Sequence, residues 1–361
     1  MPTRRSLLIG GASLAAGAAL AYGAWPRMDD FNDATARLRA PLPPDPEMTD
    51  LIRYATLAAN GHNTQPWKFK VSSNAVSIFP DFDRRTAIVD PDDHHLYVSL
   101  GCAAENLLIA AAAHGRAGAA HIETAVGTQI DIDLTSAPPR ETPLYTAIPQ
   151  RQSTRTVFGG QPVSAEDIKA LEMAAREDGV TLRIMTAEKE LESVLDYVVQ
   201  GNSAQMADPN FVAELRDWIR FSPSQALATS DGLFSACSGN PALPAWIGET
   251  MFGLVFTETA ENEKYRDQIR SSAGIAVFTG DRASPEHWIK VGRSFQRFAL
   301  QATALGIRNA HINQAVEVPE VRAEFSQWLG IGAERPDLVV RFGRAEPLPM
   351  SARRPVSEVL A

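Results

Sequence analysis

The sequence predicts an α+β protein in which two related units are fused in one chain. Its 361 residues are 45% apolar and 21% charged, the composition of a globular protein large enough for two domains. Segments with apolar residues at helical spacing alternate with short segments of period two. The order of helix, strand pair, long Ala-rich helix and strand occurs twice, which indicates a duplicated unit. We therefore expect a first unit over 29–150 and a second over 151–361, with an insertion at about 202–256.

Residues 1–28 have the pattern of an export signal. Arg4 and Arg5 precede an apolar run over 7–25, and Ala19-Leu20-Ala21 offers small residues of the kind a signal peptidase requires. The arginine pair favours the twin-arginine export machinery, which moves folded proteins. We expect an exported, periplasmic protein. The alternative is an uncleaved segment that anchors the protein to the membrane, facing the periplasm, since roughly 19 apolar residues in a helix reach about 28 Å.

The first unit is expected to begin with a polar, proline-rich segment over 29–47. His94-His95 follows an Asp-Pro-Asp-Asp run and is interpreted as a solvated turn. The periodic segments predict a helix at 51–58 that ends near Gly61, strands at 67–71 and 75–79, a long buried helix at 96–113, and strands at 121–123 and 129–134.

The second unit is expected to contain a helix that begins after the cap residue Ser164. The periodic segments predict strands at 182–185, 274–278 and 337–343 and a long amphipathic helix at 286–305. The insertion places many aromatic residues among Ser, Gly and Asn. We interpret it as a cap over a pocket, with additional core helices as the alternative.

Several function classes find no support in the sequence. The net charge of −9 argues against a nucleic-acid partner, because phosphate backbones are bound by basic surfaces. No H-E-x-x-H pattern and no Gly-x-Ser-x-Gly elbow occurs, so neither metal nor serine chemistry is expected. Cys102 and Cys237 are expected to be two separate buried thiols, with pairing in an oxidising compartment as the alternative.

Two segments carry groups suited to a phosphorylated, ring-containing ligand. In Asn60-Gly61-His62-Asn63-Thr64-Gln65-Pro66-Trp67, the amides of Asn63 and Gln65 offer both donors and acceptors, as the edge of a flavin or pyrimidine requires. A structural turn is the alternative. In Arg151-x-Ser153-x-Arg155, alternate side chains of an extended loop converge two guanidinium groups and a hydroxyl, which suits a phosphate. A solvated basic loop is the alternative there.

Two further segments lie near the end of the chain. Arg353-Arg354 joins the same phosphate site if the tail folds back, and otherwise is surface charge. Ala310-His311-Ile312-Asn313-Gln314 follows the helix that ends at Gly306, where a backbone N–H or the His311 ring can face a reactive centre.

In this order the segments resemble the nitroreductase superfamily, and most closely its Acg-type branch. The resemblance also includes Leu305-Gly306 and the segments 313–317 and 335–338, and it covers about 48–360 apart from the insertion. It implies a nitroreductase-like fold in which the two fused units form an intramolecular pseudo-dimer. A twin-arginine-like leader is common in that branch.

The resemblance implies a bound FMN, one per chain because the Arg-x-Ser-x-Arg run occurs once. By resemblance, Arg151 and Ser153 would contact the phosphate or ribityl chain, and Arg155 the N1/O2 side of the ring. The remaining implied FMN contacts are Gly61, His62, Asn63 and Gln65 along the ring, Ala310 and His311 near N5, and Arg353 with Arg354 at the phosphate. No catalytic residue is assigned, His311 being the candidate. The residues before Asn63 depart from the family's usual Pro-Ser-Ser type, which leaves the detailed ring contacts open.

The function implied by the resemblance is that of an FMN-binding oxidoreductase. NAD(P)H would be the reductant, and a nitro compound or quinone the small-molecule electron acceptor. A flavin-sequestering protein whose cap blocks turnover is the alternative, and a deiodinase- or flavin-cleaving relative is a third option. We expect a monomer or weak dimer.

Overall fold

The computed structural model describes residues 27–125 and 127–361. The expected leader, with its apolar run 7–25, therefore lies outside the described residues.

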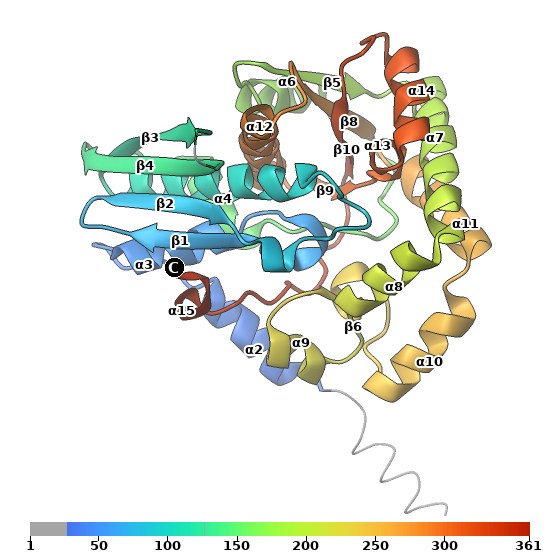
Figure 1. Ribbon diagram of the computed structural model, residues 1–361, viewed down its shortest axis with the longest axis horizontal. Coiled ribbons are helices and arrows are strands. Elements are labelled where there is room, and N and C mark those ends of the chain that lie inside the picture. Colours follow the sequence, from blue (N-terminus) through green and yellow to red (C-terminus); the bar gives the residue numbers. More distant parts are fainter. Residues whose placement is uncertain (1–26, 126) are drawn as a thin grey trace, which may run out of the picture.

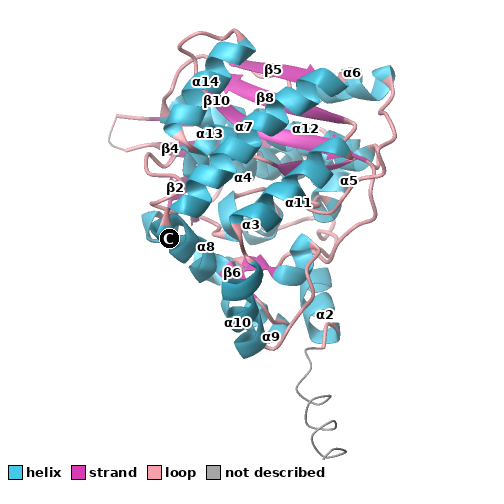
Figure 2. Cartoon of the chain, turned by 90° about the vertical axis from the view of Figure 1, so that its right-hand side faces the viewer, coloured by secondary structure: helices cyan, strands magenta, loops and turns pink. Residues whose placement is uncertain are grey.

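The α+β class is confirmed, since two antiparallel four-stranded sheets are packed against helices (Figures 1 and 2). The first sheet has the order β1-β2-β4-β3 and the second the order β5-β8-β10-β9. The first sheet consists of β1 (Trp67–Val71), β2 (Ala75–Pro80), β3 (Arg116–Glu123) and β4 (Gln129–Ser136). The second consists of β5 (Val180–Met185), β8 (Gly274–Gly280), β9 (Arg308–His311) and β10 (Pro336–Gly343).

The two sheets differ in how they are covered. In β1 and β2 burial alternates along the strand, so one face packs on the core. Every residue of β8 and β10 is buried. Ala276 and Phe278 belong to the large central core, while Ile275 and Val277 face a second core. Helices therefore cover both faces of the second sheet.

Most of the expected helices are present. The first unit contains α2 (Asp29–Leu38), α3 (Met48–Thr56), α4 (His94–Ala113) and α5 (Pro143–Ala147). The second contains α6 (Ala165–Ala174), α7 (Glu188–Ala207), α11 (Glu258–Arg270), α12 (Pro285–Ala304), α13 (Gln314–Glu317), α14 (Pro319–Leu329) and α15 (Val356–Val359). Ser164 caps α6 through the Asp167 amide, as expected. By length and composition α4 could cross a membrane, and 78% of its most apolar window is buried inside the molecule.

The long helices α4 and α12 cross at the centre of the molecule. A Cβ at Gly101 would lie 2.0 Å from the Ile289 carbonyl oxygen, and a Cβ at Gly292 would lie 2.0 Å from that of Val98. Each helix thus has a glycine where the other's backbone approaches. This reciprocal contact is compatible with a pseudo-dimer of two units.

Three expectations were wrong. Residues 29–38 form α2, which is held by Phe31, fully buried against Phe234 at a centroid distance of 4.7 Å. His94 and His95 begin α4, and His94 is fully buried instead of solvated. The stretch 308–311, for which no strand was predicted, is strand β9, paired with β10.

The insertion is folded as a series of short elements. It contains α8 (Pro209–Trp218), β6 (Ile219–Arg220), α9 (Pro223–Thr229), β7 (Leu233–Phe234) and α10 (Ala245–Val255). Asp231 ties it to the first unit through an ion pair with Arg84. The C-terminal tail returns to the first unit as well, where α15 packs on α3 and the Ala361 amide donates to the Phe69 carbonyl.

Candidate functional site

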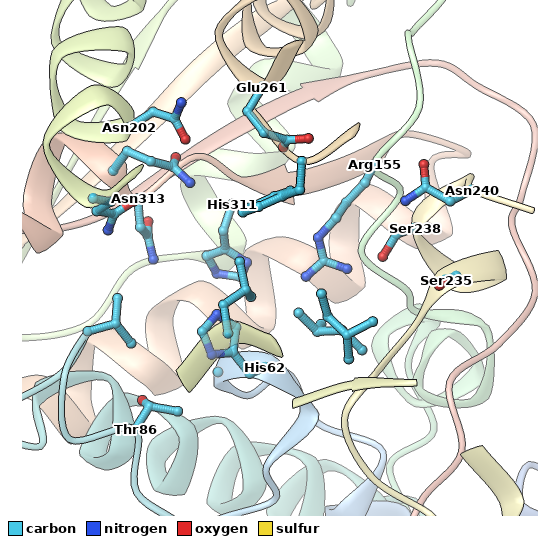
Figure 3. A pocket seen from close by; sticks show the side chains of 18 of the residues that line it. His62, Thr86, Arg155, Asn202, Ser235, Ser238, Asn240, Glu261, His311 and Asn313 are labelled. Atoms are coloured by element: carbon cyan, nitrogen blue, oxygen red, sulfur yellow. The ribbon is translucent and has the colours of Figure 1, made fainter. Parts of the chain in front are cut away.

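A cavity of about 450 Å³, here called the central pocket, lies between the two units and beneath the insertion (Figure 3). Its volume is in the range of small-molecule sites. The first unit contributes Ala59–His62 and His95 to its wall, and the second unit contributes Arg155, Phe295 and His311. The insertion supplies an apolar roof that includes Phe211, Leu215, Ile219, Phe221, Leu243, Met251 and Phe252.

The turn before β1 has a strained backbone at the pocket. His62, Asn63 and Gln65 have φ values of 46°, 56° and 55°, the left-handed region that non-glycine residues rarely adopt. Such strain persists only where surrounding contacts hold it, and it is common at functional sites. A Cβ at Gly61 would meet no atom within 4 Å. The turn therefore presents an open backbone surface to the pocket.

The amides of Asn63 and Gln65 hold this turn in place. Asn63 Nδ2 donates to the carbonyls of Gly232 and Ala352, and Gln65 Nε2 donates to that of Ser230. Gln65 Oε1 accepts from the Arg354 amide. Neither residue lines the central pocket, whereas Gly61 and His62 do. The predicted ring contacts of Asn63 and Gln65 stay predictions, and their present partners are the insertion and the C-terminal tail.

Three arginines from distant segments gather beside the pocket: Arg39, Arg151 and Arg353, here called the arginine cluster. Burial, followed by the charge of Arg151, lowers the pKa of Arg39 to about 10, and burial lowers that of Arg151 to about 10. Burial and the two neighbouring guanidinium groups hold the pKa of Arg353 well below its usual range. Among the described residues no carboxylate forms an ion pair with these three side chains. The three guanidinium groups thus lie together in a buried region without a carboxylate among the described residues to balance them, an arrangement typical of an anion site.

The arginines of the cluster differ in how many of their N–H groups already donate a hydrogen bond. Arg353 donates to the carbonyls of Thr56 and Ala58 and to Asn63 Oδ1 at 2.8 Å, and so joins the tail to the strained turn. Arg151 donates to the Leu57 carbonyl, and its buried Nε has no partner among the described residues. Arg151 therefore has the most donors available for an incoming anion.

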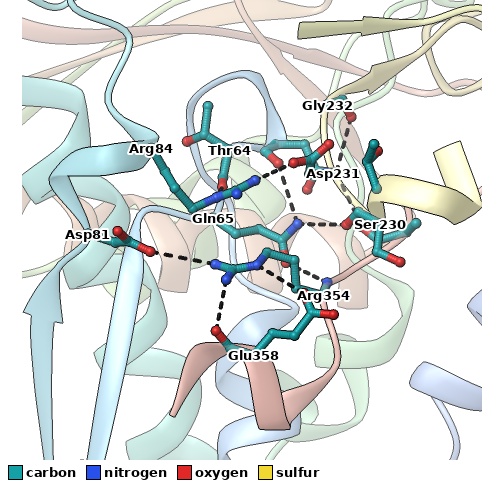
Figure 4. Close-up of polar contacts among 12 residues, drawn as sticks. Thr64, Gln65, Asp81, Arg84, Ser230, Asp231, Gly232, Arg354 and Glu358 are labelled. Carbon is teal, nitrogen blue, oxygen red and sulfur yellow. Dashed lines mark hydrogen bonds and ion pairs between the residues drawn. The ribbon is translucent and has the colours of Figure 1, made fainter. Parts of the chain in front are cut away.

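The neighbouring arginines 353 and 354 differ in their surroundings. The Arg354 guanidinium lies 3.7 Å from Asp81 and 3.5 Å from Glu358 (Figure 4). Carboxylates therefore neutralise Arg354, in contrast to Arg353. The structure does not place Arg354 with the arginine cluster, and its contact with the phosphate stays a prediction.

Arg155 links the arginine cluster to the central pocket. Its side chain lines the pocket with His62 and His311 (Figure 3). Burial first and Arg155 second lower the pKa of His62 to about 4 and that of His311 to about 3. Both imidazoles are accordingly neutral near pH 7, and Arg155 is the cation of this wall.

Ser153 and Ala310 do not line the central pocket. Ser153 forms an isolated bridge to Asn309, and Ala310 is buried in β9. Their predicted ligand contacts remain untested.

One corner of the pocket is formed by three polar residues that were not predicted as site residues from the sequence. Burial raises the pKa of Glu317, which accepts a bond of 2.7 Å from Gln205 and lies 3.9 Å from His95. All three residues line the pocket. Arg39 was also missed, because it lies in the segment expected to be a polar lead-in. No sequence signal marked Arg39. Glu317 ends the segment 313–317 that the resemblance includes, but it was given no role, and His95 was interpreted only as part of a solvated turn.

One group near the pocket has metal-ligand spacing. Potential ligand atoms of Asp90, His94 and His95 lie within 4.8 Å of one another. Both Asp90 oxygens accept amides at the start of α4, and His94 contacts Asp337 and Arg335. These atoms are therefore already engaged in the core.

Comparisons with known proteins agree on one class. No family model matches the sequence. The chain is similar to a Mycobacterium tuberculosis (strain H37Rv) protein named "Putative NAD(P)H nitroreductase Rv3131", with 25% identity over 346 residues, 88% of this chain and 92% of the relative. Another protein of the same organism and description, acg, is 24% identical over 325 residues, 85% of this chain and 93% of the relative.

Solved structures give lower similarity. A nitroreductase with bound FMN from Desulfitobacterium hafniense covers 60% of this chain and 94% of its own, with 18% identity and a TM-score of 0.36. The FMN-dependent nitroreductase NfnB from Mycobacterium smegmatis, in complex with NADPH, covers 56% and 88%, with 11% identity and a TM-score of 0.37. The two curated relatives are similar to this chain along most of its length.

Proposed function

We propose that this chain belongs to the nitroreductase superfamily, binds one FMN at the central pocket, and uses NAD(P)H to reduce nitro compounds or quinones. The arginine cluster carries the proposal, because three guanidinium groups without a carboxylate lie beside a pocket of about 450 Å³. A phosphate monoester supplies the missing charge through charge-assisted hydrogen bonds. The similarity to proteins named NAD(P)H nitroreductases favours a flavin over other phosphorylated ligands.

The residues present fit this group in three respects. Arg151 has a buried Nε without a partner and would bind the phosphate with Arg39 and Arg353. A Cβ at Gly61 would meet no atom within 4 Å, so the backbone of the turn would leave one face open for a planar ring. Arg155 provides a positive charge on the same wall, where it would stabilise negative charge on a reduced ring.

When bound, FMN supplies the transfer of hydride equivalents between NAD(P)H and the acceptor. The neutral rings of His62 and His311 form the pocket wall next to Arg155 without adding charge. The apolar roof would limit the access of water to the site, which would strengthen the interactions of Arg155. Glu317, whose pKa burial raises, holds a proton to higher pH than an ordinary carboxyl group and can donate it to a reduced acceptor.

The experiment that tests the proposal uses the purified full chain. Bound flavin should give a yellow protein, and anaerobic mixing with NADH or NADPH in a stopped-flow instrument should bleach it. The insertion that roofs the pocket favours flavin sequestration as a second candidate. Bound flavin that neither nucleotide bleaches over minutes would establish sequestration instead, and a protein that binds no flavin contradicts both.

The leader supports an exported location, in the periplasm or anchored facing it. Arg4 and Arg5 would direct the folded chain to the twin-arginine machinery. Cell fractionation of the tagged chain tests this. Replacing both arginines with lysine should retain the protein in the cytoplasm, and unchanged export of that variant argues for another route.

A further inference from the structure

The helix α10 exposes an unusually apolar surface. Trp246 is 70% exposed, Leu254 69% and Val255 55%. Trp246, Thr250 and Leu254 follow one another at four-residue spacing and therefore share one side of the helix. The Thr250 hydroxyl donates to the Trp246 carbonyl, so the polar member of this row has its hydrogen already paired. This row of three residues thus has little polar surface that needs water, and the exposed carboxylate of Glu249 lies next to it on the helix.

The opposite side of the same helix lines the central pocket. Gly248, Phe252 and Phe256 contribute to its roof, together with Met251. Helix α10 therefore lies between part of the pocket and the surroundings, and the exposed Glu249 is the one charged residue among its eleven. An isolated helix of this kind is stable where both sides contact apolar material. With eleven residues α10 is too short to span a bilayer, but it can lie in the interface plane.

The position of the chain start indicates what covers α10. The described chain begins at Arg27, directly after the apolar run 7–25, and enters α2. Helix α2 packs on α9 of the insertion through Phe31 and Phe234. Figures 1 and 2 both show the start of the described chain, α2, α9 and α10 at the same end of the molecule. A bilayer reached by residues 7–25 would therefore lie at the end of the molecule that carries α10.

We propose that α10 docks in the surface of a lipid bilayer and opens the central pocket to it, so that the electron acceptor is a quinone with a long apolar tail. This inference rests on the proposed function and specifies its substrate class. The quinone takes a hydride equivalent from NAD(P)H and one proton from Glu317, which water then reprotonates, to become the hydroquinone, and NAD(P)+ is released. The apolar roof then serves as the passage for the tail, and the polar corner with Glu317 receives the quinone head.

The docking is measured first by a readout that does not depend on the flavin. Full-length protein is mixed with phosphatidylcholine vesicles whose acyl chains carry bromine, which quenches tryptophan emission on contact. We expect the wild type to be quenched and Trp246→Phe to lose that part of the quenching. Leu254→Glu should weaken binding to the vesicles about tenfold or more, because a charged side chain is unfavourable at the apolar boundary of a bilayer. The matched control is Met173→Glu on α6, where Met173 is 55% exposed at the far end of the molecule, and it should bind as the wild type does.

The second readout compares two acceptors. Leu254→Glu should slow reduction of a long-tailed quinone dissolved in the vesicles, while leaving a short, water-soluble quinone unaffected. Quenching that does not depend on residue 246, or a dimer that Leu254→Glu dissociates, overturns the proposal, because the leader or a second copy would then cover α10. Vesicle quenching without reduction of either quinone would leave the docking intact and contradict the proposed function instead.

Discussion

The substitution Arg151→Gln distinguishes the phosphate of the proposed ligand from its ring. The Arg151 side chain is 4% exposed and donates to the Leu57 carbonyl, while its Nε has no partner among the described residues. Glutamine retains an amide donor but removes the charge. A charge-assisted bond to phosphate contributes about 1.5–3 kcal/mol, so the Kd for FMN should rise about 10- to 150-fold.

The assay titrates ligand-free protein with flavin and follows the quenching of flavin fluorescence. Riboflavin has the same ring without the phosphate, and its Kd should not change in Arg151→Gln. Arg354→Gln is the matched control, because carboxylates already neutralise Arg354, and it should leave the Kd for FMN unchanged.

Two results would refute this reasoning. If Arg151→Gln weakens riboflavin as much as FMN, the substitution has disturbed the whole pocket and the phosphate lies elsewhere. If Arg354→Gln weakens FMN as strongly as Arg151→Gln, the absence of a counter-charge does not identify the phosphate site.

Three further predictions follow from the packing and the buried charges. Gly61→Val should abolish flavin binding with little change in Tm, because its side chain enters open space in front of the turn, and a large fall in Tm would contradict this. Gly101→Ala should lower the free energy of unfolding by about 1–3 kcal/mol or more through overpacking against α12, whereas Gly253→Ala, with no atom within 4 Å, should be neutral or stabilising in chemical denaturation. Burial raises the pKa of Asp337 to about 7, so the folded chain binds this proton more tightly than the unfolded chain. That contribution to stability is complete below the unfolded pKa of about 3.9 and is lost as pH rises through about 7. The Tm of the wild type minus that of Asp337→Asn should therefore fall across this pH window. A difference that does not change with pH would contradict the prediction.

The sequence predicted those elements whose signal is local. The strand pair β1 and β2 and the helices α4 and α12 were located to within a few residues from local patterns. Apolar residues alternate in β1 and β2, form a nearly continuous run in α4, and recur at helical spacing in α12. Helix α2 was missed since Phe31 is its one buried aromatic residue and its partner, Phe234, lies far along the chain. The environment of His94 was also set from a distance, by Asp337 on β10.

The candidate site shows the same division. The segments around Gly61, Arg151, Arg155, His311 and Arg353 were recognised from the sequence, and the structure brings them to one region. The separation of Arg353 from Arg354 could not be foreseen, because it depends on the carboxylates that each guanidinium meets. Sequence motifs thus identify residues near a ligand, whereas the carboxylates beside each buried arginine determine which guanidinium groups remain available to bind it.

That balance also bears on when the proposed ligand can enter. The arginine cluster requires Arg39 from α2 and Arg353 from the C-terminal tail, and Arg353 in turn bonds to Thr56, Ala58 and Asn63 of the first unit. The proposed anion site is therefore complete only after the chain has been synthesised as far as Arg353 and the tail has returned to the first unit. A ligand that binds only the folded state stabilises it, by about 2.7 kcal/mol at a hundredfold excess over Kd, and here it also relieves repulsion among buried charges. Loading then holds the two units and the tail together, and on the proposed twin-arginine route it would precede export, because that route carries folded proteins.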